Sequence, residues 1–192
     1  MKELNTYINN TDYSGVKDFF LKRGKKQTFR KKEYFVLQNT LSLYAGFIEE
    51  GIFHYFCTSD DGKEHVVGYS FENEFVCDYS SFIKRTGSLV SIRALTECTV
   101  YTISLNDYLE YANTTQNGLH FGFQVANDLF EMYYKRLIAL YCENPEQRYI
   151  NLMKQCPDLK EKISLKEIAS FLGVSPETVS HIRKKLLLEC KY

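Results

Sequence analysis

The chain has 192 residues, of which 44% are apolar and 15% aromatic. This composition excludes a chain that is disordered throughout, because the apolar side chains suffice for one large core or two smaller ones. The 24 Lys and Arg balance the 24 Asp and Glu, so net charge alone does not indicate a nucleic-acid-binding protein. The balance is uneven, however: residues 145–192 hold nine cations and six anions, which favours a negatively charged partner at this end.

The six cysteines are scattered, and none forms the C-x-x-C pair that is typical of zinc-ribbon or iron–sulfur sites. We therefore expect no metal and no cofactor, and thiols that pack as small side chains. The N-terminus lacks the apolar core of a signal peptide, and no apolar run approaches the ~18 residues of a membrane span. These features predict a reduced, cytoplasmic protein without a membrane partner.

Residues 30–105 predict a β-rich region. Short apolar runs alternate with turn signals, as in LYAGFIEEGIFHYFCTSDDGKEHVVGYSF. The pairs Glu50-Gly51 and Asp61-Gly62 are turn dipeptides, and the second is typical of a hairpin loop. Several short strands at this spacing predict a closed double-layer sheet such as a jelly roll.

Residues 117–143 predict one long helix. Seven apolar residues recur at alternating spacings of four and three, which is the pattern of a heptad seam. Such a stripe serves either a twin helix in a second subunit or the surface of the β-rich region. Its unbroken length favours the twin, so we expect a homodimer with the seam Leu119, Phe123, Ala126, Phe130, Tyr133, Leu137 and Leu140.

Residues 144–192 predict a third, helical region. Asn144 begins a first helix as its N-cap. Ser164 and Glu167 form a capping box ahead of a second helix, and Gly173 can adopt the positive φ that ends it.

The last predicted helix begins at its N-cap, Ser175, and spans residues 176–187. Two helices joined by a short turn with glycine form a helix-turn-helix, a motif of many DNA-binding proteins. The faces on which the two helices meet are predicted to be Ile168, Ala169, Leu172, Val174, Val179 and Ile182.

The opposite face of the last helix suits the major groove of DNA. Glu177 can accept a hydrogen bond from a cytosine amine, and Ser180 and His181 reach base edges one turn later. The alternative is a solvated amphipathic helix whose cations favour its C-terminal end. We expect the bases to be read by Pro176, Glu177, Ser180 and His181, and the phosphate backbone to be held by Ser175, Thr178, Arg183, Lys184 and Lys185.

The stretch ISLKEIASFLGVSPETVSHIRKKL resembles the helix-turn-helix of the cyclic AMP receptor protein and Fnr (Crp/Fnr) family of bacterial transcription regulators. The stretch GKEHVVGYSFENEFVCDYSSF resembles a branch common in Bacteroidetes-type bacteria. The resemblance covers nearly the whole chain and implies an α+β fold: a double-stranded β-helix (jelly roll) of cyclic-nucleotide-binding type, a dimerisation helix and a winged-helix-type DNA-binding domain. We expect these at residues 1–116, 117–143 and 144–192, with the wing hairpin short or missing because the sequence ends at Tyr192.

The resemblance also implies a function. It indicates a homodimer without enzymatic activity that binds palindromic double-stranded DNA under the control of its sensor domain, with RNA polymerase as a partner if it activates transcription. His181 stands where relatives usually have Arg, and Pro176 where some have another. We therefore expect weaker discrimination at the guanine that those arginines read, while the cytosine opposite Glu177 stays specified.

The effector of such a sensor domain is less clearly specified by the sequence. In the family, a glutamate takes the ribose hydroxyl of cyclic AMP and an arginine pairs with its phosphate. The resemblance places Asp78 at the glutamate and Ser88 at the arginine, with Lys84 and Arg85 as the nearest cations. A buried phosphate without a cation is costly, so we expect cyclic AMP not to bind in the usual way. The alternatives are a roll that binds nothing, an unidentified small ligand, or a cyclic nucleotide at a non-standard site formed by these four residues.

A distant alternative is a metal-dependent enzyme of the cupin type. His54, Glu64 and His65 lie on neighbouring predicted strands. Adjacent residues of a strand face opposite sides, however, so Glu64 and His65 cannot both bind one metal ion. We therefore expect no catalytic residue and no metal site.

Overall fold

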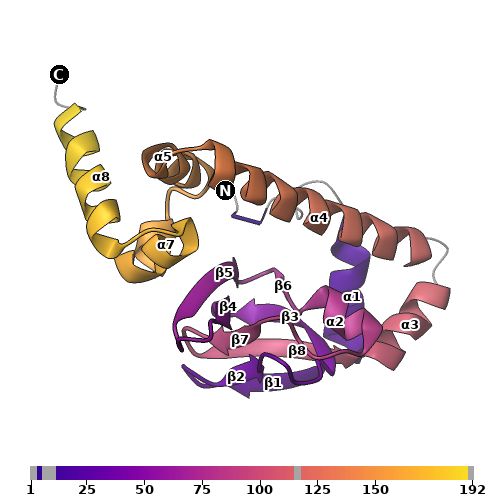
Figure 1. Ribbon diagram of the computed structural model, residues 1–192. Helices are drawn as coiled ribbons and strands as arrows, with labels where there is room; N and C mark the ends of the chain where they lie inside the picture. Colours follow the sequence, from indigo (N-terminus) through magenta and orange to yellow (C-terminus); the bar gives the residue numbers. More distant parts are fainter. Residues whose placement is uncertain (1–3, 6–11, 115–117, 190–192) are drawn as a thin grey trace. The chain divides into compact units, whose positions relative to one another are not determined.

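The computed structural model describes residues 4–5, 12–114 and 118–189 and forms two compact units (Figure 1). One unit comprises residues 5–130, and the other comprises Leu4 and the residues from Glu131 onward. The division falls inside the long helix α4 (Gly118–Cys142), which therefore contributes to both units.

The first unit is built on two antiparallel sheets of four strands each. The double layer is confirmed, but the predicted closure is wrong, because no strand of one sheet pairs with a strand of the other in the described residues. One sheet has the order β1 (Lys25–Phe29), β8 (Cys98–Ser104), β3 (Tyr44–Glu50) and β6 (Phe75–Val76). The other has the order β2 (Tyr34–Val36), β7 (Ser91–Ala94), β4 (Phe53–Thr58) and β5 (Glu64–Ser70).

The main core of this unit lies between the two sheets. Side chains alternate along a strand, so Phe47 and Ile48 of β3 point to opposite faces of their sheet. Ile48 is buried in one cluster with Phe53 and Ile92 of the second sheet, whereas Phe47 is buried in another cluster with Phe20 of α1 (Ser14–Arg23). The first sheet is therefore covered on both faces.

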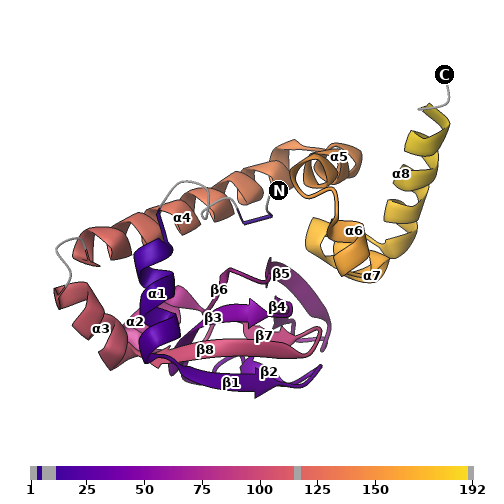
Figure 2. The ribbon, with the colours of Figure 1, turned by 180° about the vertical axis from the view of Figure 1, so that it is seen from behind.

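Three helices lie together at one end of the sheets, as Figures 1 and 2 show: α1, α2 (Tyr79–Lys84) and α3 (Leu105–Thr114). They bury Phe20, Phe82 and Leu105 in a shared cluster. The sequence pattern predicts neither α2 nor α3, because both are short and depend on these tertiary contacts.

The two predicted turns connect neighbouring strands of this unit. Gly51 joins β3 to β4 with φ +103°, and Gly62 lies in the hairpin between β4 and β5 with φ +80°. The hairpin closes with a 3.0 Å hydrogen bond that the Ser59 amide donates to the Lys63 carbonyl. Both turn predictions are confirmed.

The second unit is helical beyond α4. Its elements are α5 (Pro145–Gln155), α6 (Leu159–Lys162), α7 (Leu165–Leu172) and α8 (Pro176–Glu189). Each of these helices buries at least one apolar side chain, and Leu152, Leu159, Ile168 and Val179 are all buried. The short α6 adds one turn of helix that the sequence does not predict. No strand occurs in residues 144–189, so this described part of the chain contains no wing hairpin.

Candidate nucleic-acid interface

The turn between α7 and α8 is fixed by local hydrogen bonds. Ser164 caps the start of α7, where its hydroxyl accepts from the Glu167 amide at 3.3 Å. Gly173 ends α7 in the left-handed conformation, at φ +69°, and its amide donates to the Ser170 carbonyl at 3.1 Å. The Val174 amide reaches back to Ala169 at 3.0 Å, which completes the usual glycine-terminated helix end.

Helix α8 starts with a cap of its own. The Ser175 hydroxyl accepts from the Thr178 amide at 3.2 Å and lies 3.1 Å from the Thr178 hydroxyl. The carboxylate of Glu177 follows in the first turn, where its own amide and the Ser175 hydroxyl lower its pKa. Glu177 is therefore ionised near neutral pH and can only accept hydrogen bonds, as reading a cytosine amine requires.

The buried face of the helix pair agrees with the sequence prediction. Ile168, Ala169 and Leu172 of α7 are buried, as are Val179 and Ile182 of α8. Ala169 has no exposed surface, so a larger side chain there would push the helices apart. Val174 is half-buried.

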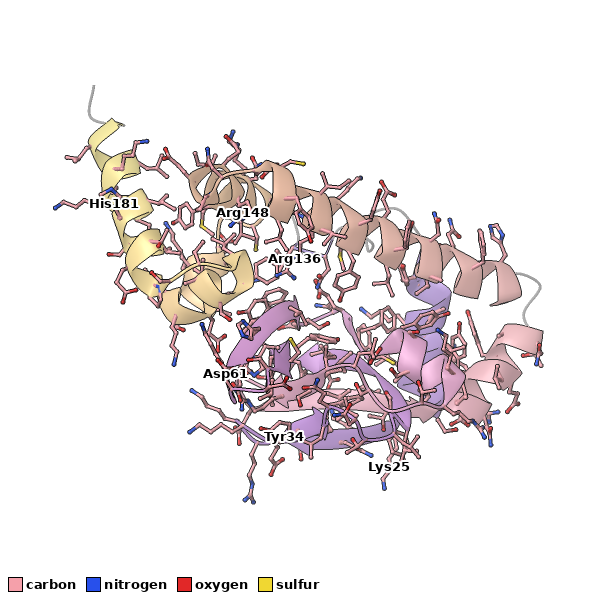
Figure 3. The ribbon with its side chains drawn as sticks, in the orientation of Figure 1. Lys25, Tyr34, Asp61, Arg136, Arg148 and His181 are labelled. Atoms are coloured by element: carbon pink, nitrogen blue, oxygen red, sulfur yellow. The ribbon has the colours of Figure 1, made fainter. Side chains whose placement is uncertain are left out.

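The predicted base-reading residues lie on the other side of α8. Glu177, Ser180 and His181 are exposed, and Pro176 is half-buried (Figure 3 labels His181). On a helix, positions 177, 180, 181 and 184 fall on one face. The structure therefore brings together most of the residues predicted to contact bases.

The cations predicted to hold phosphates divide into two groups. Arg183 and Lys184 are exposed. Lys185 instead turns toward α5, where its ammonium lies 2.8 and 2.9 Å from the two carboxylate oxygens of Glu146. Lys185 is one turn from the buried Ile182 and lies on the side of α8 that faces α5, so it holds the helices together in this structure.

Two arginines that sequence analysis does not identify fasten the end of α7 (Figure 3). Arg136 of α4 donates to the Phe171 carbonyl at 2.7 Å, and its guanidinium lies 3.6 Å from the centre of the Phe171 ring. Arg148 of α5 donates to the Leu172 carbonyl at 3.1 Å and to the Glu143 carbonyl at 2.6 Å. Cations at a helix end satisfy carbonyls that lack a partner within the helix.

The apolar stripe of α4 is largely exposed. Phe123 is 73% exposed, Phe130 65% and Tyr141 85%. Two residues of the predicted seam lie differently: Tyr133 and Leu140 project from the side of α4 that carries Arg136, and Leu140 lies beside the backbone of Gly173. The side chain of Leu119 lies outside the described residues, and Ala126 is exposed.

The four residues of the candidate effector pocket do not converge. The carboxylate of Asp78 accepts from the Ser88 hydroxyl at 3.0 Å, so these two meet. Arg85 turns to α3, where it donates to the Asn106 side chain at 2.9 Å, and Lys84 is exposed.

Two residues of the alternative metal site, His54 and Glu64, are bridged by the guanidinium of Arg93. Arg93 donates to His54 Nε2 at 3.1 Å and to Glu64 Oε2 at 2.7 Å, so its guanidinium links these two side chains. Burial, with the Arg93 charge, lowers the pKa of His54 to about 4, and Glu64 opposes this shift. His65 is exposed. In the described ranges no three His, Cys, Asp or Glu are grouped as a metal site would require.

Comparison with protein families matches residues 26–115 to the cyclic nucleotide-binding domain. Comparison with curated proteins gives no match. Within the described part of the chain, no helix is both long and apolar enough to cross a membrane.

Comparison with solved structures matches nearly the whole chain. FixK2 from Bradyrhizobium japonicum has a TM-score of 0.74 at 13% identity, covering 86% of this chain and 85% of its own. A CooA mutant from Carboxydothermus hydrogenoformans has a TM-score of 0.72 at 18% identity, covering 97% and 85%. A putative transcriptional regulator of the Crp/Fnr family from Eubacterium rectale has a TM-score of 0.70 at 16% identity, covering 96% and 88%. At these identities the likeness establishes a shared fold.

Proposed function

We propose that this chain, which has the fold of Crp/Fnr-type regulators with a cyclic nucleotide-binding domain at residues 26–115, is a homodimeric, DNA-binding transcription regulator. The observation that carries the proposal is α8: a capped helix, packed on α7 by its apolar face, with Glu177, Ser180 and His181 exposed on the other. A helix with this combination of faces fits the major groove.

Sequence reading is assigned to the exposed face of α8. Glu177 accepts from a cytosine amine, while His181 offers at most one hydrogen bond where an arginine would offer two to guanine. Phosphate contacts are assigned to Ser175 and Thr178 at the start of α8, and to Arg183 and Lys184. Lys185 joins them only if its bond to Glu146 opens.

Dimerisation is assigned to α4, with the pairing face rotated slightly from the predicted seam. The most exposed apolar side chains are Phe123, Phe130, Tyr134 and Tyr141, with Leu137 beside them. These positions are separated by seven, four, three and four residues, which follows a heptad repeat with the polar Asn127 at the position between Phe123 and Phe130. They also leave Tyr133 and Leu140 on the side of α4 toward α7.

Selection of random-sequence DNA duplexes by the purified full-length protein tests the proposal. We expect two inverted half-sites with centres about one helical turn, or ~34 Å, apart, as a two-fold dimer requires. The Glu177→Ala variant should relax one base pair in each half-site by about 1–3 kcal/mol of discrimination, whereas Glu161→Ala on α6 should keep the whole motif. If folded, dimeric protein enriches no inverted repeat, the proposal is contradicted.

Sedimentation analysis tests the pairing face with two neighbouring tyrosines of similar exposure. Tyr134→Glu places a charge in the centre of the proposed face and should shift the protein toward monomer. Tyr133→Glu is the matched control and should leave more dimer at the same concentration. If Tyr133→Glu instead leaves less dimer than Tyr134→Glu, the seam predicted from the sequence is favoured.

A further inference from the structure

The match to the cyclic nucleotide-binding domain makes it possible to ask whether the side chains of the first unit could hold the phosphate of a cyclic nucleotide. A cyclic nucleotide carries a phosphate anion, and a protein that buries such an anion must supply hydrogen-bond donors and a compensating cation. In the first unit, a group of hydrogen-bond donors lies where the start of α2 meets the segment that precedes β7. They belong to Ser81, Ser88 and Leu89.

These donors are already bound by an anion of the protein itself. One oxygen of Asp78, Oδ2, accepts from the Ser81 hydroxyl and from the Leu89 amide, each at 2.8 Å. It also lies 3.0 Å from the Ser88 hydroxyl, whose single proton is shared with the Val90 carbonyl at 2.7 Å. The other oxygen, Oδ1, lies 3.4 Å from the Ser81 amide. Ser81 and Ser88 are 2% and 1% exposed, so water has almost no access to their hydroxyls. The carboxylate thus joins two segments of the chain that are ten residues apart.

The cations of the same loop serve elsewhere. Arg85 ends α2 in the left-handed conformation, and its guanidinium donates to Asn106 of α3. Lys84 is exposed. Among the described residues, no Lys or Arg forms an ion pair with Asp78. A phosphate at this point would therefore meet a carboxylate and no positive charge.

We infer that the Asp78 carboxylate is the built-in anion of this loop, and that it excludes the phosphate of a cyclic nucleotide from these donors. A second anion would have to displace Asp78 from its hydrogen bonds to Ser81 and Leu89 and remain beside its negative charge. The residues therefore do not fit the ligand that the domain match implies. The Asp78 carboxylate itself joins the start of α2 to the segment that precedes β7. This inference deepens the sensor part of the proposed function.

Calorimetric titration of the unmodified full-length protein with cyclic AMP, and separately with cyclic GMP, is the first test. We expect no binding up to millimolar nucleotide. Binding of either nucleotide at micromolar concentration would overturn the inference. Because no DNA is present in this experiment, that result would leave the DNA-binding proposal intact, and the two failures are distinguishable.

Chemical rescue tests the role of the carboxylate itself. Asp78→Ala should lower the melting temperature, and formate should restore part of the loss, because a free carboxylate can enter the vacated position. Sodium chloride at the same ionic strength should not restore it. Asp107→Ala is the control: Asp107 also accepts from a serine, but its donors come from Ser104 alone, so formate should have no comparable effect. A folded Asp78→Ala variant whose melting temperature is indifferent to formate would overturn the inference.

Discussion

The two units of the chain fix a short helix with charged side chains, but they use opposite charges at opposite helix ends. In the first unit, the carboxylate of Asp78 takes the donors at the start of α2. In the second, the guanidinium groups of Arg136 and Arg148 take the last carbonyls of α7. Both arrangements follow from the unpaired amides at a helix start and the unpaired carbonyls at a helix end.

The difference shows that charged side chains at a helix end can occupy a candidate binding site in one unit and leave one exposed in the other. Asp78 occupies the donors that an anionic ligand would need, so the loop of the first unit is satisfied internally. Arg136 and Arg148 approach α7 from α4 and α5, and they leave Glu177, Ser180 and His181 of α8 exposed. The charged groups thus occupy the candidate anion site of the first unit, whereas in the second unit they bind α7 and leave the exposed face of α8 unoccupied.

The largest expected effect comes from breaking the arginine contacts. Arg148→Ala removes two hydrogen bonds to main-chain carbonyls, and we expect the unfolding free energy of the second unit to fall by about 4 kcal/mol. Arg148→Lys keeps the positive charge but loses the planar set of guanidinium donors. Its unfolding free energy should lie between those of the unmodified protein and Arg148→Ala. Hydrogen exchange at amides of α7, compared with amides of β8, would locate the loss. Equal losses in both units would contradict the assignment.

Acidification should destabilise the first unit more than the second, the reverse of the Arg148 effect. The pKa of His54 is lowered to about 4 in the folded chain, mainly by burial and then by the Arg93 charge, against 6.5 unfolded. The unfolded chain therefore takes up the proton first, and the first unit should lose up to roughly 3 kcal/mol of stability as pH falls from 6.5 to 4.

The matched variant for this pH effect is His54→Gln, which keeps an acceptor for Arg93 but does not titrate. Subtracting its pH profile from that of the unmodified protein, in urea titrations, isolates the histidine from the carboxylates. An identical profile for the variant would show that another group dominates.

The smallest expected effect compares two glycines in the left-handed conformation. Alanine at Gly173 or Gly62 meets no close contact, since the nearest atom to its Cβ lies at 3.7 Å for Gly173 and none lies within 4 Å for Gly62. Conformational strain alone should cost about 1–2 kcal/mol in each case. Gly173→Ala should destabilise the second unit and Gly62→Ala the first, as local hydrogen exchange would show. A larger cost at Gly173 would mean that the turn also resists movement of α8.

Local rules explain why much of the helical unit could be predicted. The caps at Asn144 and Ser164 are confirmed by hydrogen bonds from amides three residues later, and Gly173 has the positive φ expected of it. Each rule concerns residues within one helical turn, so the sequence alone contains the whole interaction. The β-rich region and its two glycine turns could be predicted for the same reason.

Several side-chain contacts join distant parts of the chain, and no spacing in the sequence indicates them. Arg136 meets a carbonyl 35 residues away, and Arg93 meets His54 39 residues away. The same limit applies to Lys185, where helical periodicity alone does not show that Glu146 of α5 lies opposite. Cationic residue types suggest phosphate contacts, but only packing shows which cations are already bound.

The exposed aromatic face of α4 has a consequence for how such a protein would be controlled in a cell. If two copies pair through this face, the concentration of dimer at low abundance rises with the square of the monomer concentration, by mass action. Changes in the rates at which the chain is synthesised and degraded would then be amplified at the level of the dimer, and DNA binding that requires the dimer would depend steeply on abundance.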